Sequence, residues 1–336
     1  MSLGCDKFKF SLGCYNCKEL ESSNETLSAK NRTSGLYIPN KFNQLREIYS
    51  RWGHNVRYLG ASNVSLKQAR ESYLFKDVKQ NKALLPIDSL PEVSFEVLQQ
   101  NKAQFKQNAL EHFFFHYESR DPETKVPLLN NSGDEIQELY KKGKKPFIFG
   151  WSAMVPTIKR KGFDSFIDSI WELFAYLQEN GNEKNINDFL FLFLGEAEEY
   201  QKSISRMPIG FNSIICGKLP VEESLKYLSA CDVYCCTTSE DAGPRTVSES
   251  LGIGTPVISY ADCIAPDLID KDCGWIVEAG NVKKYSQAMF DALDLYHNSP
   301  DKLKQMSKNS YDSYHKNYSM ENLSKQWFKA LEVDQK

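Results

Sequence analysis

The sequence predicts an α/β fold with a parallel sheet, and three observations carry this prediction. Short apolar stretches alternate with helical segments, and the alternation becomes regular after Pro146. The 336 residues correspond to two domains of about 150 residues each. Apolar residues make up 41% and charged residues 25% of the chain, as in ordinary folded proteins. Strands separated by helices of this length favour a parallel sheet with helices on both faces.

The first half of the chain has the weaker pattern. Apolar spacing predicts a helix over 40–52, a strand at 56–59, a helix to about Tyr73 and a strand at 82–85. After residue 88 the pattern weakens, and 121–134 is rich in Pro, Asn, Ser and Gly. We therefore place the domain junction there. The expected domains are 1–134, 135–300, and C-terminal helices over 301–336 that pack back towards the first domain.

After Pro146 the expected elements follow one another at even spacing. Strands are expected at 147–150, 189–194, 213–216, 233–237 and 257–260. Helices are expected at 161–177, 221–230 and 245–251, and the remainder, 282–331, is predicted to be helical throughout. In open parallel sheets, ligands bind beyond the carboxyl ends of the strands. The polar segments that follow these strands are therefore the candidate binding segments.

Charge and composition narrow the function classes. A formal net charge of -3 and a pI near 6.0 exclude a general attraction to nucleic acid or anionic lipid. No apolar run approaches the about 20 residues that cross a bilayer, and the first 20 residues lack a secretory pattern. A cytoplasmic location is therefore expected. The nine cysteines are an odd number and lie largely in apolar segments, which predicts free thiols.

The segment around Asp241 runs from a predicted strand through a polar turn into a predicted helix. Ser239 or Asp241 is placed to cap that helix. The backbone N–H groups of Arg245 and Thr246 are expected at the positive end of the helix dipole, where a diphosphate binds. Asp241 and Glu249 are expected to line one cleft at different depths. Two carboxylates there can accept hydrogen bonds from sugar hydroxyls.

This segment resembles the signature of family 4 glycosyltransferases, in which two carboxylates are separated by seven residues and small residues, Gly, Pro and Val follow. Here the pattern is Asp241, Glu249 and Gly254-Thr255-Pro256-Val257. The resemblance covers about 146–290 and includes further residues: Gly150, Lys161-Gly162, Gly195, Gly217-Lys218-Leu219, Asp232 and Gly274. It implies the GT-B fold, with a complete C-terminal Rossmann-like, doubly wound parallel sheet and an incomplete N-terminal α/β domain within which the chain begins.

The resemblance also implies roles for individual residues. Asp241 would contact the donor sugar and Lys161 the diphosphate, and these two are the predicted catalytic residues. Glu249 would hold the ribose hydroxyls. The remaining predicted binding residues form two groups. A loop would contact sugar and phosphate through its backbone and consists of Ala242, Gly243, Pro244, Arg245 and Thr246. A turn near the base consists of Lys218 and Leu219.

Two positions depart from the family pattern. The first carboxylate is Asp241 where the family has glutamate, so either the loop lies closer or a water relays the sugar contact. Trp151 stands where family members often carry an arginine. Arg160, Lys159 or no residue replaces that arginine.

The implied activity is transfer of a hexose from a UDP- or GDP-sugar, with retention of configuration and without a metal ion. The expected acceptor is a saccharide or lipid-linked saccharide in cell-surface polysaccharide synthesis, which would bring the protein to the inner face of the membrane. No cofactor is expected, because neither a metal-ligand pattern of histidines with carboxylates nor an Asp-x-Asp clamp is present. Protein groups must then stabilise the phosphate charge.

Other interpretations remain open. Cys5, Cys14 and Cys17 resemble a cysteine loop in the N-terminal domain of some polysaccharide-building family 4 enzymes, and three such ligands can hold zinc only with an incomplete tetrahedron. The chain can also be a nucleotide-sugar-binding module that is inactive without an upstream segment. A phosphorylase-like enzyme of the same architecture would need a cofactor lysine that no motif identifies. Asp241 and Glu249 can also be a plain helix cap and a solvated glutamate.

Overall fold

The structure is a computed structural model in which part of the chain is described. The described residues are 47–48, 50–51, 57–71, 75, 78–85, 90, 93–118, 143, 145–179, 188–197, 199–200, 206–208, 212–239, 241 and 243–331. They divide into two compact units, residues 1–86 with 320–336 and residues 87–319. The three N-terminal cysteines, most of the predicted 40–52 helix and residues 121–134 lie outside the described residues.

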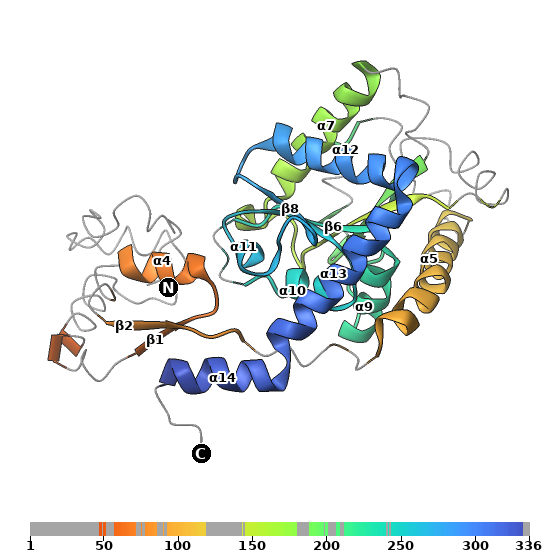
Figure 1. The fold of residues 1–336 in the computed structure, drawn as a ribbon. Coiled ribbons are helices and arrows are strands. Elements are labelled where there is room, and N and C mark those ends of the chain that lie inside the picture. Colours follow the sequence, from red (N-terminus) through yellow and green to blue (C-terminus); the bar gives the residue numbers. More distant parts are fainter. Residues whose placement is uncertain are drawn as a thin grey trace, which may run out of the picture. The chain divides into compact units, whose positions relative to one another are not determined.

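The larger unit contains a six-stranded sheet and the helices around it (Figure 1). Its strands are β3 (Phe147–Ser152), β4 (Phe189–Leu194), β5 (Asn212–Ile215), β6 (Val233–Cys236), β7 (Val257–Tyr260) and β8 (Gly274–Val277). Its helices are α5 (Phe95–Glu118), the 3-10 helix η4 (Lys159–Lys161), α7 (Phe163–Glu179), α9 (Val221–Ala230), α10 (Arg245–Gly252), α11 (Ala265–Leu268), α12 (Val282–Asn298) and α13 (Pro300–Tyr318).

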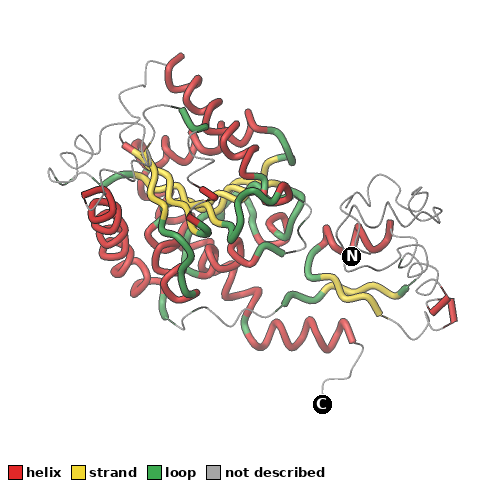
Figure 2. The backbone as a smooth tube through the Cα atoms, turned by 180° about the vertical axis from the view of Figure 1, so that it is seen from behind, coloured by secondary structure: helices red, strands yellow, loops and turns green. Residues whose placement is uncertain are grey.

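All six strands are parallel, in the order β5-β4-β3-β6-β7-β8. The chain builds the sheet outward from β3 through β4 to β5 and then returns to place β6 on the other side of β3. The strand order therefore reverses between β3 and β6. In such sheets this reversal opens a crevice beyond the carboxyl ends of the two strands, where ligands bind. Figure 2 shows the strands side by side with helices packed around them.

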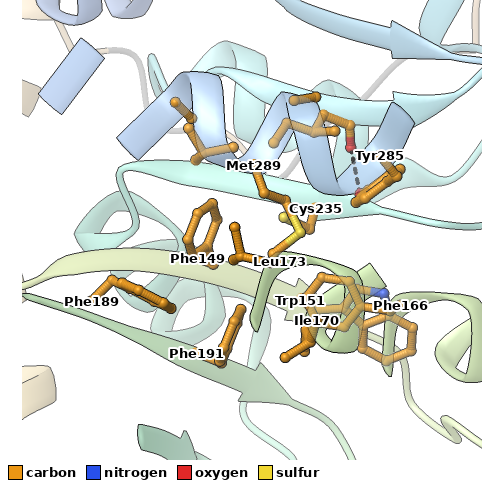
Figure 3. Close-up of a cluster of buried hydrophobic side chains, with 14 of the residues drawn as sticks. Phe149, Trp151, Phe166, Ile170, Leu173, Phe189, Phe191, Cys235, Tyr285 and Met289 are labelled. Atoms are coloured by element: carbon orange, nitrogen blue, oxygen red, sulfur yellow. Dashed lines mark hydrogen bonds between the residues drawn. The ribbon is translucent and has the colours of Figure 1, made fainter. Parts of the chain in front are cut away.

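An aromatic core holds one face of this sheet under α7 and α12. Phenylalanines of β3 and β4 lie against Phe166, Ile170 and Leu173 of α7, while Tyr285 and Met289 come from α12 (Figure 3). The side chains of Phe149 and Phe191 are fully buried, with ring centroids 5.5 Å apart. Aromatic side chains bury large apolar areas, so this core makes the sheet a rigid support for the loops at its edge. On the other face lie α9 and α10.

The predicted parallel α/β fold is confirmed, but one long helix was not expected. Every expected strand and helix from residue 147 to 260 is present with its ends shifted by at most two residues. Helix α5 occupies a region where the apolar pattern is weak. Its buried side includes Lys106 besides apolar side chains, which explains why apolar spacing did not reveal it. The edge strand β8 was also not predicted as a strand, and its Ile276 is exposed.

Helix α5 is joined to the sheet by a buried cluster of charges. Asp232, which precedes β6, accepts hydrogen bonds from Lys106 Nζ at 2.6 Å and from the Ile148 amide at 2.8 Å. Lys102 Nζ lies 3.5 Å from the same carboxylate. Burial alone would raise the pKa of Asp232, but the two ammonium groups and these hydrogen bonds lower it below its usual value. This pairing joins α5 to the larger unit, 87–319, whereas the predicted first domain, 1–134, included these residues.

The smaller unit contains the parallel strands β1 (Arg57–Gly60) and β2 (Lys79–Lys82), with α4 (Asn63–Glu71) and α14 (Met320–Leu331). Helix α14 contacts the β2 segment: Trp327 Nε1 donates to the Leu84 carbonyl at 2.9 Å and Asn81 Nδ2 to that of Ala330 at 2.7 Å. Strand β2 ends at Lys82, so the strand expected at 82–85 begins earlier than predicted. Among the described helices, none combines the length and apolar character needed to span a membrane.

Candidate functional site

A cavity of about 370 Å³ lies where several strands of the larger unit end. Segments that follow β3, β4 and β5 line it, together with the beginning of α10. Its lining residues are Ser152, Ala153, Met154, Lys161, Leu194, Gly195, Gly217, Lys218, Leu219, Val221, Ser224, Leu228, Pro244, Arg245, Thr246 and Glu249. The cavity therefore occupies the carboxyl edge of the sheet, beside the point where strand order reverses.

Most of the predicted site residues meet in this cavity. They are Lys161, Lys218, Leu219, Pro244, Arg245, Thr246 and Glu249. Asp241 and Gly243 are not part of the lining, although Asp241 contacts Lys161. Ala242 lies outside the described residues. Segments 161, 218 and 245–249 are far apart in the sequence, so their convergence follows from the parallel sheet.

Glu249 is a buried carboxylate within the cavity wall. Only 7% of the residue is exposed, and Arg245 Nε lies 3.0 Å from its Oε1. Helix α10 is buried from Val247 to Gly252 because it packs between the sheet and α13. Glu249 therefore cannot be a solvated surface glutamate. An ionised carboxylate accepts hydrogen bonds through two oxygens, and hydroxyl groups of a ligand are donors of the matching kind.

Asp241 lies beside the cavity, in an ion pair with the η4 segment. Its Oδ2 is 2.7 Å from Arg160 Nη1 and 3.1 Å from Lys161 Nζ, and its Oδ1 accepts a hydrogen bond from the Gly243 amide at 3.3 Å. Burial would raise the pKa of this carboxyl, but the Lys161 charge and hydrogen bond, the Gly243 amide and the Arg160 charge lower it.

The expected capping of α10 by Asp241 or Ser239 is wrong. The N-cap residue is Pro244, and no side chain caps the helix. The carboxylate of Asp241 is turned to the two cations of η4 instead. The backbone amide of Ser239 donates to the Arg160 carbonyl at 2.8 Å, so this segment is also joined to η4. Trp151, which stands where the family often has an arginine, is buried and donates to Thr237 Oγ1 at 3.1 Å. Of the two residues considered as a replacement for that arginine, Arg160 is the one that contacts Asp241.

Lys161 is held at the cavity by a backbone turn that requires glycine. Gly162 follows with a φ of 71°, and a Cβ at this position would lie 2.0 Å from the Thr237 carbonyl oxygen. Thr237 Oγ1 donates in turn to the Lys161 carbonyl at 3.3 Å. The chain therefore forms a short 3-10 turn, and α7 begins at Phe163, two residues later than the helix start predicted at 161.

Replacing Gly162 by alanine is expected to destabilise the larger unit by about 3 kcal/mol, because left-handed strain and a steric clash with Thr237 add. Gly280 is the matched control: its φ is 76°, but a Cβ there meets nothing within 4 Å. Gly280→Ala therefore carries the strain without the clash and should cost about 1–2 kcal/mol. Urea denaturation measures both. Equal losses for the two variants would show that the close approach to Thr237 is unimportant.

Two hydroxyl groups at the cavity were not predicted from the sequence. Ser152 ends β3 and lines the cavity, and Tyr234 lies in β6 behind it. Tyr234 Oη donates to Thr246 Oγ1 at 2.8 Å and lies 3.2 Å from Ser152 Oγ. Only the position of Ser152, two residues after the predicted strand 147–150, signalled a role. Tyr234 is indistinguishable in the sequence from a core residue.

The charges of the lining favour an anionic ligand. Among the described lining residues, Lys161, Lys218 and Arg245 are cationic and Glu249 is the one acidic side chain. The positive end of the α10 dipole adds to this charge, because the first residues of that helix line the cavity. An anion with polar hydroxyl groups therefore matches both the cations and the buried carboxylate.

Comparison with known proteins gives a family and a fold. Solved structures with similar folds include S. aureus TarM in complex with Fondaparinux, alpha-GlcNAc-glycerol and UDP (TM-score 0.55, 11% identity). Anabaena HepE with UDP and glucose (0.52, 13%) and a Rickettsia africae glycosyltransferase (0.54, 14%) are also similar. The alignment with TarM covers 88% of this chain and 47% of TarM. The corresponding values are 88% and 69% for HepE, and 93% and 76% for the Rickettsia protein. The chain thus spans less than half the length of TarM.

No curated protein matches the sequence. The similarity to solved structures establishes the GT-B glycosyltransferase fold. The family model described as "Glycosyl transferases group 1" matches residues 128–313, which is more than half of the chain and includes the whole cavity lining. The chain therefore belongs to the glycosyl transferases group 1 family.

Proposed function

We propose that this protein transfers a hexose from a UDP- or GDP-sugar to a saccharide acceptor. The observation that carries the proposal is the cavity at the carboxyl edge of the sheet, where three cations and the buried Glu249 surround one space. A nucleoside diphosphate sugar combines the two groups that this lining suits, an anionic diphosphate and ribose and hexose hydroxyls. Among similar folds, TarM and HepE were solved with UDP.

The proposed binding mode follows the charges. The diphosphate lies at Lys161 and the first turn of α10, the ribose hydroxyls lie at Glu249, and the base lies near Lys218 and Leu219. Negative charge builds on the β-phosphate as the bond to the sugar breaks. Preorganised cations and a helix N-terminus stabilise that charge more in the transition state than in the ground state. Transfer with retention and without a metal ion is part of this proposal.

Asp241 is proposed to contact the donor sugar. Its carboxylate is held at the edge of the cavity by Arg160 and Lys161, and its lowered pKa keeps it ionised. An ionised carboxylate accepts hydrogen bonds from sugar hydroxyls. Lys161 contacts Asp241 and also lines the cavity, so one ammonium group would bridge the sugar and phosphate parts of the donor. The acceptor is proposed to be a saccharide or lipid-linked saccharide of a cell-surface polymer, reached from the cytoplasmic side of the membrane.

Lys161→Ala is expected to weaken UDP or GDP binding about 10- to 100-fold, the equivalent of one hydrogen bond to a charged group. Isothermal titration calorimetry measures the dissociation constants. The matched control is Lys283→Ala, which removes an exposed lysine of α12 outside the cavity lining. A Lys161 variant that binds as tightly as the control variant would contradict the proposed diphosphate site.

A nucleotide-sugar-binding module without transferase activity is the second candidate. One observation favours it: every lining residue belongs to the unit 87–319, so donor binding needs no residue of the smaller unit. Release of UDP or GDP from the nucleotide sugar, followed over time with and without oligosaccharide acceptors, separates the two functions. Tight binding without release would favour the module.

A further inference from the structure

Tyr234 joins the end of β3 to the first turn of α10 through its hydroxyl group. Its ring is buried in β6 with 2% of the residue exposed. The hydroxyl reaches Thr246 Oγ1 at 2.8 Å in the first turn of α10 and Ser152 Oγ at 3.2 Å at the end of β3. Both partners line the cavity, whereas Tyr234 does not. Within the described residues, the Tyr234 hydroxyl is thus hydrogen-bonded to two side chains of the cavity lining.

The protons of these three hydroxyls can be assigned by counting donors. A tyrosine hydroxyl has one proton, and Tyr234 donates it to Thr246 Oγ1. The hydrogen bond with Ser152 must then use the serine proton, with the Tyr234 oxygen as acceptor. Burial raises the pKa of Tyr234, with a further contribution from Cys236, so its proton stays in place at neutral pH.

The Thr246 hydroxyl is consequently an acceptor towards Tyr234 and keeps its own proton for another partner. Within the described part of the chain, this hydroxyl makes its one hydrogen bond with Tyr234. Thr246 is partly exposed and lines the cavity beside Arg245 and Lys161. A hydroxyl proton at this place meets an anionic oxygen favourably, because hydrogen bonds to charged acceptors are the stronger ones.

We propose that Tyr234 is a positioning residue, which holds the Thr246 hydroxyl so that its proton is donated to a diphosphate oxygen of the bound nucleotide. This inference rests on the proposed donor site. Tyr234 contributes by preorganisation: with its oxygen fixed, Thr246 loses less rotational freedom when the nucleotide binds.

The placement of Tyr234 differs from that of Tyr285, another buried tyrosine. Tyr285 donates to the backbone carbonyl of Ile258 at 3.0 Å. Backbone groups bonded in this way stabilise the fold, and their effect on a ligand is indirect. Tyr285 is as deeply buried as Tyr234 and lies outside the cavity lining, which makes Tyr285→Phe the matched control.

The test is a double-mutant cycle on nucleotide affinity. UDP, or GDP if the protein selects guanine, is titrated by calorimetry into the wild type, Tyr234→Phe, Thr246→Val and the double variant. Tyr234→Phe should weaken binding about fivefold through lost preorganisation. Thr246→Val should weaken it about tenfold through loss of the phosphate hydrogen bond. The double variant should bind no more weakly than Thr246→Val alone, because Tyr234 acts through Thr246.

Two controls separate positioning from structural damage. Tyr285→Phe should leave UDP affinity within about twofold of the wild type, with a thermal shift similar to that of Tyr234→Phe. Uridine, which lacks the diphosphate, should bind the wild type and Tyr234→Phe equally.

Failure of the positioning role and failure of the proposed function give different results in this test. Losses that add in the double variant, or an equal loss for uridine, would overturn the positioning role, as would wild-type affinity in Tyr234→Phe. If the wild type binds neither UDP nor GDP, the proposed function itself fails and this inference with it.

Discussion

Glu249→Ala is expected to weaken UDP or GDP binding about 100-fold, because the buried carboxylate would lose two hydrogen bonds to ribose hydroxyls worth about 1.5 kcal/mol each. The direction of the change in nucleotide affinity distinguishes a lost contact from a change of charge. Removing Glu249 also releases Arg245, and this adds positive charge to the cavity. Charge alone would therefore strengthen the binding of an anion, so a loss of affinity reports the lost carboxylate contacts.

Isothermal titration calorimetry with each nucleotide measures this effect. The matched control is Glu278→Ala, which removes an exposed carboxylate in the turn after β8. Circular dichroism and thermal unfolding verify that the Glu249 variant is folded. A folded Glu249→Ala protein that binds nucleotides as tightly as the wild type would disprove the ribose assignment.

Asp232→Ala is expected to lower the free energy of unfolding by about 3–5 kcal/mol, since it leaves the buried Lys106 ammonium without its partner. The exposed pair of Asp164 and Arg206 is the matched control, because Asp164→Ala should cost at most about 1 kcal/mol. Urea denaturation compares the two. Asp232→Leu combined with Lys106→Met should recover stability relative to Asp232→Ala, since it removes the charge of Asp232 together with that of Lys106, its more deeply buried partner. Similar losses of unfolding free energy for Asp232→Ala and Asp164→Ala would contradict the stabilising role of the buried cluster.

The contribution of Asp232 should also depend on pH. Its pKa in the folded protein is lowered, so its ionised form stabilises the fold. This stabilisation is fully present above the unfolded pKa of about 3.9 and is lost as the pH falls through the folded value. The stability difference between the wild type and Asp232→Ala should therefore be constant near neutral pH and decrease below about pH 4.

The sequence determined the fold of the larger unit because its strands are short, almost fully apolar and bounded by turns. Strands β4 and β7 were predicted with correct ends, since both faces of a parallel strand are buried and its residues form an apolar run. Helix α5 was missed for the opposite reason. Its inner side uses lysines that pair with Asp232, and such a pairing has no local signature.

The site was predictable where its chemistry is local. Glu249, Arg245 and Thr246 lie within five residues of one helix, and the glycine after Lys161 marks a backbone turn. The partners of Asp241 were not predictable in this way. A carboxylate before a helix ordinarily caps it, but the cations of η4 are brought to Asp241 by contacts about 80 residues away in the chain.

By itself, the sequence of this protein determined an α/β chain with a parallel sheet and the residue types of an anion site at its carboxyl edge. The periodicity of apolar residues and short motifs reflect interactions between residues that are close in the sequence. The strands, the helices and the residue types of the anion site depend on interactions of this local kind. Only the tertiary structure decided that Glu249 is buried, that Asp241 pairs with Arg160 and Lys161, and that Tyr234 joins Ser152 to Thr246. Those features arise where the strand order reverses and side chains from separate segments of the chain meet, which no local pattern encodes.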